Sequence, residues 1–146
     1  MESEFIPYNL ALSLKALGYD ETCFGFYYRK EINLFQSCEI QKRKNSSYVK
    51  EFMDNEDCVA PTWQSSFKWF RDNYGFHVTY SEPYPVLKGM DNKWRCSIKN
   101  MNRLFHNYTN HRYIVGETYE EAQQKCLLKL IEIVESINEK NEKNNK

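Results

Sequence analysis

The sequence GETYEEAQQKCLLKLIEIVE (residues 116–135) has the pattern of an amphipathic helix with a well-marked start. Thr118 stands at the N-cap position and Glu121 follows three residues later, so each side chain can bond the free backbone N–H of the other. Apolar residues then recur at helical spacing, namely Ala122, Cys126, Leu127, Leu130, Ile133, Val134 and Ile137. The pattern predicts the last helix of a small α+β domain. Glu117, Glu120 and Glu121 disfavour phosphate binding at its N-terminus.

The composition excludes a global attraction to nucleic acid or to anionic membranes. The chain has 146 residues, enough for one domain, and twenty Lys and Arg balance twenty Asp and Glu. Aromatic residues make up 16% of the chain. We expect these rings to fill a core that is poor in aliphatic side chains, and a ring-lined binding surface is the alternative.

The cysteines indicate a reducing compartment. Their number is odd and no two have the short spacing of a metal or redox motif; they are Cys23, Cys38, Cys58, Cys96 and Cys126. We expect reduced, buried thiols. The first residues show neither a basic leader nor an apolar signal core, and no stretch is apolar enough to span a membrane. We therefore expect a protein of a reducing cytoplasm that makes no membrane contact.

The part of the chain before residue 60 predicts a helix, a hairpin and a connection. The helix ends at Gly18, and the connection could hold one short helix. In the first hairpin strand, Phe24, Phe26 and Tyr28 lie on one side. The helix, the two strands and the short helix span residues 6–17, 22–29, 31–40 and 48–53, and the connection spans 41–59.

The part from residue 60 onward predicts a helix, three strands, the capped helix and a tail. On the first helix, Trp63, Phe67, Phe70 and Tyr74 form the apolar stripe, and Trp69 lies away from it. The strands alternate apolar and polar residues. These elements span residues 60–73, 76–80, 94–99, 111–115 and 118–137, and the disordered tail spans 138–146.

The elements give the order α-β-β-(short α)-α-β-β-β-α and an α+β fold, in which helices pack against one antiparallel sheet. We expect a single composite domain over residues 1–137, because the first 57 residues are too few for an independent core. It combines an N-terminal α-β-β unit (residues 5–40), the connection, and an α-β-β-β-α unit (residues 60–137).

The α-β-β-β-α order resembles that of double-stranded RNA-binding domains. The resemblance implies a Lys-rich start to the last helix that holds phosphates, but this chain has Thr118-Tyr-Glu-Glu121 there. Carboxylates at that position repel phosphate and remove counterion-release contacts. Residues 61–137 also carry a net charge of only +2, from ten basic and eight acidic side chains. Double-stranded RNA is therefore not an expected partner.

A polar sheet face is the first candidate binding site. If Trp94, Cys96 and Ile98 face the helices, their neighbours in sequence point to the opposite face. We expect that face to carry His77, Thr79, Lys93, Arg95, Ser97, Lys99 and, if its strand keeps register, Arg112. The face could hold an acidic partner, a nucleotide or single-stranded nucleic acid. The alternative is an ordinary solvated face of an antiparallel sheet.

No pattern in the sequence indicates catalysis. His77, His106 and His111 have no metal-ligand spacing with one another or with the cysteines. The five glycines are isolated, so the sequence has no phosphate-binding loop. Nothing places a histidine beside a cysteine as a nucleophilic pair. We therefore expect no enzymatic activity, no metal and no cofactor.

Five short segments point together to a family. They are IPYNLA (6–11), CFG (23–25), APT (60–62), FKWFR (67–71) and TYEEA (118–122). Together they resemble a family of small uncharacterised proteins from Bacteroides-group gut bacteria and from their bacteriophages and prophages. The resemblance spans most of residues 6–135 and implies a phage or mobile-element accessory gene. It transfers no activity and no functional residue.

We expect a non-catalytic phage or mobile-element accessory protein that binds a host or phage protein, with inhibition of a defence system as one outcome. Rings left over from the predicted stripes support this, because rings anchor many interfaces; they are Tyr27, Trp69, Tyr84 and Tyr119. One alternative is a sequesterer of a nucleotide or small anion that uses His77, Arg95 and Arg112. Another is a nucleic-acid-binding module that uses the same face. The oligomeric state is open.

Overall fold

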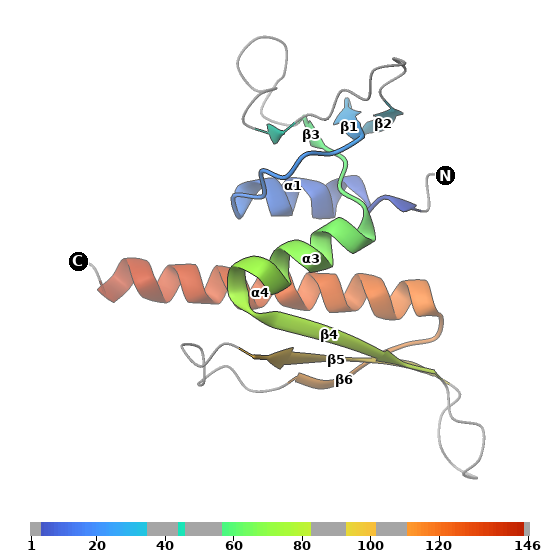
Figure 1. Cartoon of the computed structure of the whole chain (residues 1–146), viewed down its shortest axis with the longest axis vertical. Helices are drawn as coiled ribbons and strands as arrows, with labels where there is room; N and C mark the ends of the chain where they lie inside the picture. The colour runs from blue at the N-terminus through green and yellow to red at the C-terminus, as the bar shows by residue number, and fades with distance from the viewer. Residues whose placement is uncertain (1–3, 35–43, 46–56, 83–92, 102–110, 145–146) are drawn as a thin grey trace. The chain divides into compact units, whose positions relative to one another are not determined.

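The computed structural model describes residues 4–34, 44–45, 57–82, 93–101 and 111–144 (Figure 1). Helices and antiparallel strands make up most of these ranges, which confirms the predicted α+β fold class. The chain divides into two compact units, Met1–Trp69 and Phe70–Lys146. The predicted single domain over residues 1–137 stays a prediction. The predicted short helix at 48–53 lies outside the described residues.

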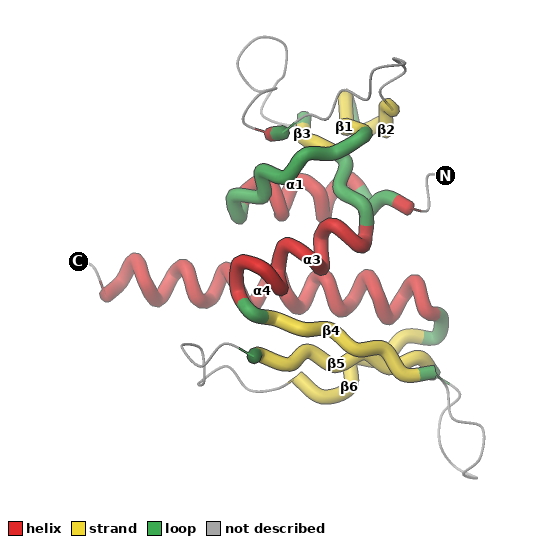
Figure 2. The backbone as a smooth tube through the Cα atoms, in the orientation of Figure 1, coloured by secondary structure: helices red, strands yellow, loops and turns green. Residues whose placement is uncertain are grey.

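In the first unit, helix α1 (Tyr8–Ala16) lies against one face of a small sheet (Figure 2). Its apolar side chains Leu10 and Leu14 are buried. Gly18, with a φ of 90°, follows the helix in the left-handed conformation that glycine adopts without strain. The helix predicted over residues 6–17 is therefore confirmed to within two residues at each end.

The sheet of the first unit has the strand order β2-β1-β3, and both pairs of neighbours are antiparallel. The strands are β1 (Gly25–Tyr28), β2 (Glu31–Leu34) and β3 (Cys58–Val59). The predicted hairpin is confirmed over the residues that the structure describes. The sequence did not predict β3, which lies in the expected connection, because a strand of two residues shows no alternation.

The β1–β2 turn places two residues other than glycine in the left-handed region. Arg29 has a φ of 50° and Lys30 a φ of 69°. A two-residue turn with both φ angles positive matches the twist of the flanking strands, and Asn-Gly is its usual sequence. The side chain of Asp57 accepts a hydrogen bond from the Arg29 N–H at 3.2 Å, which helps to hold the turn.

Two buried polar residues connect distant parts of the first unit. The Asn45 side chain donates from Nδ2 to the Tyr19 carbonyl at 2.6 Å and accepts from the Val59 N–H at 3.0 Å. The backbone carbonyl of Asp57 accepts from the Lys15 ammonium at 2.6 Å. Both Asn45 and Asp57 come from the segment that the sequence indicates is only a connection, and both are buried.

Helix α3 (Trp63–Tyr74) has a marked start and a marked end. The Thr62 hydroxyl accepts a hydrogen bond from the Ser65 N–H at 3.1 Å, which caps the first turn. Gly75, with a φ of 72°, follows the last residue. The helix predicted over residues 60–73 is therefore confirmed, with a start three residues later and an end one residue later than predicted.

The buried face of α3 differs from the predicted stripe. Phe70 is fully buried, as expected, but Trp69 has an exposed fraction of only 6%. The Trp69 ring packs against the ring of Tyr19, with centroids 5.6 Å apart. Tyr19 is remote in the sequence, so helical spacing cannot reveal this contact. The prediction of Trp69 as an outward ring is wrong.

In the second unit, three antiparallel strands form a sheet of order β4-β5-β6. They are β4 (Phe76–Ser81), β5 (Trp94–Asn100) and β6 (His111–Gly116). All three predicted strands are confirmed. The alternation is confirmed as well, because Cys96 and Ile98 are buried whereas His77 and Thr79 are exposed. The described strands thus form two small sheets, where the sequence predicts one.

Helix α4 (Tyr119–Asn144) covers one face of the second sheet (Figure 1). Every apolar residue of the predicted stripe is buried. Thr118 caps the helix as predicted, since its hydroxyl accepts the Glu121 N–H at 3.1 Å. The Glu121 carboxylate, however, accepts from the Glu117 N–H at 2.7 Å, one residue before the predicted donor.

The end of α4 extends through the segment predicted to be a disordered tail. Residues 138–144 are helical, although most of their side chains are exposed. Four of these seven residues are Glu or Lys, which have high helix propensity, and the other three are Asn. Lengthening an existing helix also avoids the cost of nucleation. The prediction of disorder for these residues is wrong because it considered burial alone.

Candidate functional site

The predicted polar face of the second sheet is accessible to solvent. His77 and Thr79 of β4 and Lys99 of β5 are exposed, and Arg95 and Ser97 are half-buried. The strand register places His77 directly opposite Lys99. The hydroxyls of Thr79 and Ser97, which form the next outward pair, lie 2.7 Å apart in a hydrogen bond. The structure therefore brings together most of the described residues predicted for this face.

The carboxylates near this face form local ion pairs. Lys93 Nζ, just before β5, lies 2.9 Å from Glu117 Oε1, so part of its charge is neutralised. Lys125 Nζ lies 2.6 Å from Glu121 Oε1. The hydrogen bond from Lys125, with that from the Glu117 N–H, holds the pKa of Glu121 below its usual range. The N-terminus of α4 is thus acidic, and two of its carboxylates, Glu117 and Glu121, form ion pairs with lysines.

The structure does not describe the side chains of two further residues predicted for binding. Tyr84 lies outside the described residues. Arg112 belongs to β6, and the pairing of β6 with β5 shifts register between Cys96 and Ile98. The sequence places Arg112 on the face only if β6 keeps register, and because the structure does not describe the Arg112 side chain, this placement stays a prediction.

The rings expected to anchor a partner belong mostly to the cores. Tyr27 has an exposed fraction of 7%, and its hydroxyl donates to the Ile6 carbonyl. Its ring meets Tyr8 edge to face, with centroids 5.5 Å apart. Tyr119 packs against two rings of the second unit at centroid distances of 5.1 and 5.2 Å. The prediction of Tyr27 as an outward ring is therefore wrong, as it is for Trp69.

The exposed rings of the first unit lie on the other side of β1. Phe24 has an exposed fraction of 50% and Tyr28 of 42%, and Phe26 between them is half-buried. The Arg29 guanidinium lies over the Tyr28 ring, 5.2 Å from its centroid. The alternation of the sequence placed Phe24, Phe26 and Tyr28 on one side. It did not show that this side faces outward.

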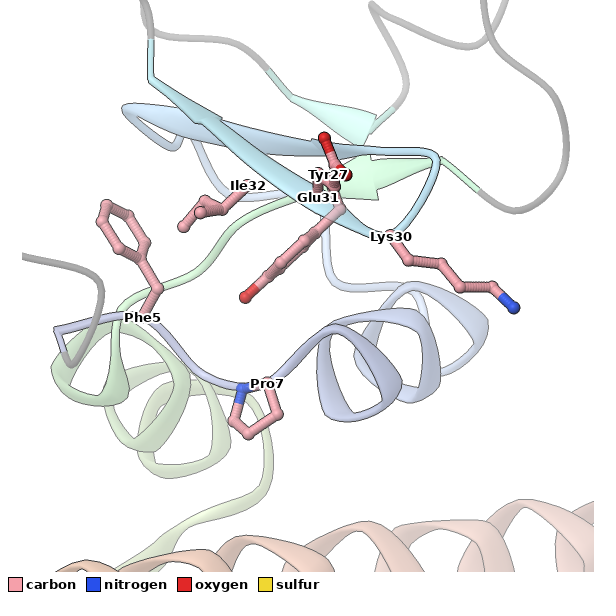
Figure 3. A pocket seen from close by; sticks show the side chains of 6 residues that line it. All are labelled: Phe5, Pro7, Tyr27, Lys30, Glu31 and Ile32. Carbon is pink, nitrogen blue, oxygen red and sulfur yellow. The ribbon is translucent and has the colours of Figure 1, made fainter.

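A pocket of about 550 Å³ lies on the opposite side of the hairpin (Figure 3). Its lining residues are Phe5, Pro7, Tyr27, Lys30, Glu31 and Ile32. The side chains of Tyr27 and Ile32 extend from the sheet toward the Phe5–Pro7 side, whereas the charged ends of Lys30 and Glu31 point away. Such a lining suits an apolar or aromatic group better than a phosphate. None of the described basic residues predicted for ligand binding lines it.

The cysteines in the described ranges are buried thiols. A hydrogen bond with Cys96, together with burial, holds the pKa of Cys126 far above its usual value. In the first unit, burial raises the pKa of Cys23 to about 11 and that of Cys58 to about 12. A thiol with a raised pKa is a poor nucleophile at neutral pH. The geometry gives no support to a catalytic role for these four cysteines.

The raised pKa of Cys58 predicts a loss of stability at alkaline pH. The thiol ionises near its ordinary value of 9.0 in the unfolded chain but only near 12 in the folded chain. Its contribution is complete below pH 9 and falls by about 1.4 kcal/mol per pH unit above it, because only the unfolded state then loses the proton. The free energy of unfolding in urea should therefore fall less between about pH 8 and about pH 10.5 for Cys58→Ala than for the wild type. Equal losses in the two proteins would contradict the prediction.

Metal binding and membrane insertion find no support in the described residues. No group of three or more His, Cys, Asp or Glu side chains among them is placed to hold a metal ion. None of the helices within the described ranges combines the length and the apolar character that crossing a bilayer requires.

Comparisons with protein-family models, with curated proteins and with solved structures give no match for this chain. The resemblance of segments such as TYEEA (118–122) to small phage and Bacteroides-group proteins therefore stays a prediction.

Proposed function

We propose that this chain acts without catalysis, by binding a protein through the outward face of the β1–β2 hairpin. The observation that carries the proposal is the exposure of two nearby rings, with exposed fractions of 50% for Phe24 and 42% for Tyr28. Half-buried Phe26 lies between them, and Arg29 adds a guanidinium at the tip. Aromatic and arginine side chains are enriched at the energetic centres of protein interfaces.

The tip of this face is ordered before a partner arrives. Asp57 holds the backbone of Arg29, and the Arg29 guanidinium rests on the ring of Tyr28. Side chains that are already positioned lose less conformational entropy on binding than mobile ones. Tyr28 and Arg29 therefore have the properties of anchor residues, with Phe24 extending the contact along the strand.

The biological setting of the proposal comes from the sequence resemblance. Segments such as IPYNLA (6–11) and FKWFR (67–71) support an accessory protein of a phage or mobile element. Its target would be a host or phage protein, and inhibition of a defence system would be the outcome. Sequestration of a nucleotide and binding of nucleic acid stay predictions, and the exposed rings of the hairpin favour neither.

Removing the two exposed rings should strongly reduce capture of the partner. Tagged wild-type protein should recover a stoichiometric partner from lysates of bacterial hosts or of phage-infected cells, and Phe24→Ala/Tyr28→Ala should recover at least tenfold less. That factor corresponds to a loss of about 1.4 kcal/mol of binding free energy. The matched control is Met101→Ala/Leu128→Ala, which removes exposed apolar side chains in the second unit, with exposed fractions of 68% and 41%.

Three results of the capture experiment would contradict binding through the hairpin face. A wild type that captures nothing stoichiometric, or a hairpin variant that captures as much as the wild type, would refute binding through this face. Equal losses in the hairpin variant and the control would show that exposed apolar area in general is responsible. The defence setting is tested by phage plating on a host with a defence system, which expression of the wild type but not of the hairpin variant should raise.

A further inference from the structure

Charge in the second unit is divided between its sheet and its helix. The sequences of the strands β4, β5 and β6 contain no Asp or Glu but include Arg95, Lys99 and Arg112. Seven of the ten acidic residues of this unit lie instead in α4 and just before it, namely Glu117, Glu120, Glu121, Glu132, Glu135, Glu139 and Glu142; the other three, Asp72, Glu82 and Asp91, lie outside the strands. The sheet is thus basic, although the chain as a whole has no net charge.

The basic side chains have a defined spacing on the outer face of β4 and β5. Arg95 and Lys99 lie four residues apart on the same side of β5, which corresponds to about 13 Å along an extended strand. His77 stands opposite Lys99 on β4. The hydrogen-bonded hydroxyls of Thr79 and Ser97 fill the space between the two cations. The face therefore has positive ends and a neutral, polar middle.

We propose that this face binds an acidic, extended segment of a partner protein. In such a segment, carboxylates at positions i and i+4 repeat with the same spacing of about 13 Å. One carboxylate meets Arg95 and the other meets Lys99 and His77, while a polar side chain between them contacts the Thr79 and Ser97 hydroxyls. The face belongs to the second unit, so this proposal does not depend on binding by the hairpin.

The same observations favour a peptide over a nucleic acid. Nucleic-acid binding depends on many cations that each neutralise a phosphate. The described outer face presents two cations with a pair of hydroxyls between them. Glutamate is also present at its edge, where Glu117 forms an ion pair with Lys93. Two well-separated positive charges match two separated carboxylates more closely than a continuous row of phosphates.

The probe is a short fluorescent peptide with glutamate at every fourth position and serine or valine between, measured by anisotropy at low salt. The wild type should bind it, with an affinity that falls as salt rises. Arg95→Gln/Lys99→Gln should bind at least tenfold more weakly. Lys129→Gln/Lys140→Gln on α4 removes the same charge and should bind like the wild type, as should Phe24→Ala/Tyr28→Ala on the hairpin.

Two comparison probes test the geometry. A peptide with the same number of glutamates in one cluster, and a labelled oligothymidylate, should both bind more weakly than the spaced peptide. Equal binding of the clustered peptide would overturn the spacing argument, and tighter binding of the oligothymidylate would identify a nucleic-acid surface instead. No binding by the wild type, or equal losses in the sheet and α4 variants, would also overturn the proposal. Circular dichroism of each variant checks that the fold is intact.

Discussion

Gly116→Ala is expected to destabilise the second unit by about 3 kcal/mol, because the added methyl group has no room. A Cβ at this position would lie 2.3 Å from the backbone nitrogen of Ala122 and 2.7 Å from its Cα. Those atoms belong to the helix α4, so they cannot move aside as the end of a flexible side chain can. Gly116 also pairs with Trp94 at the end of the sheet, which restricts movement on the strand side.

The matched control for Gly116→Ala is Gly18→Ala. A Cβ at Gly18 meets nothing within 4 Å, and the only penalty is the φ of 90°. That penalty is about 1 kcal/mol. Urea unfolding followed by circular dichroism should show a clearly larger loss for Gly116→Ala. If the two variants lose the same stability, the close approach of β6 to α4 is not the constraint that the geometry indicates.

Asn45→Ala is expected to cost about 3 kcal/mol of stability in the first unit, because it leaves two buried backbone groups without their partner. The Tyr19 carbonyl loses the amide donor at 2.6 Å, and the Val59 N–H loses the amide acceptor at 3.0 Å. Asn45 itself is buried, so water does not readily replace the side chain. Urea unfolding at neutral pH measures the loss.

Asn45→Asp separates the two hydrogen bonds. A carboxylate at position 45 can still accept the hydrogen bond from the Val59 N–H. It cannot donate to the Tyr19 carbonyl, however, and its negative charge repels that oxygen. Protonation restores a donor, so the pKa of this aspartate should be raised in the folded state. Its deficit relative to the wild type should therefore shrink as pH falls from about 7 to about 4. A deficit that is independent of pH would show that the contact with Tyr19 contributes little.

Local sequence patterns are sufficient for most of the fold. The cap at Thr118 and the apolar spacing after it predict α4, and alternation predicts β4, β5 and β6. Gly18 and Gly75 end helices where the sequence places those ends. All these features depend on residues within a few positions of one another, which is why they can be recognised without a structure.

Long-range packing decides what the sequence does not show. Trp69 is buried because it meets Tyr19, and Asn45 is buried because it joins two remote backbone groups. Alternation separates Tyr27 from Tyr28 but cannot tell which side of β1 the helix α1 covers. Residue spacing contains no information on these choices, since each depends on a partner distant in the sequence.

The candidate surfaces follow the same division. Alternation correctly predicts that His77, Thr79 and Lys99 face outward on the second sheet. The placement of Arg112 stays a prediction, and the pairing of β5 with β6 shows a register shift of which a single strand gives no sign. Alternation also predicts that the rings of the hairpin share one side of the strand. Only the folded unit shows that this side faces outward.

At the turn between β1 and β2, the stability of the fold and the proposed binding would place opposite demands on the sequence. Arg29 and Lys30 hold φ angles of 50° and 69°, which costs on the order of 1 kcal/mol for each residue. Asn-Gly would relieve that strain without altering the hairpin. Selection for stability alone would therefore favour Asn-Gly at these two positions. If the proposed binding uses this tip, the chain gives up some stability in exchange for two cations there.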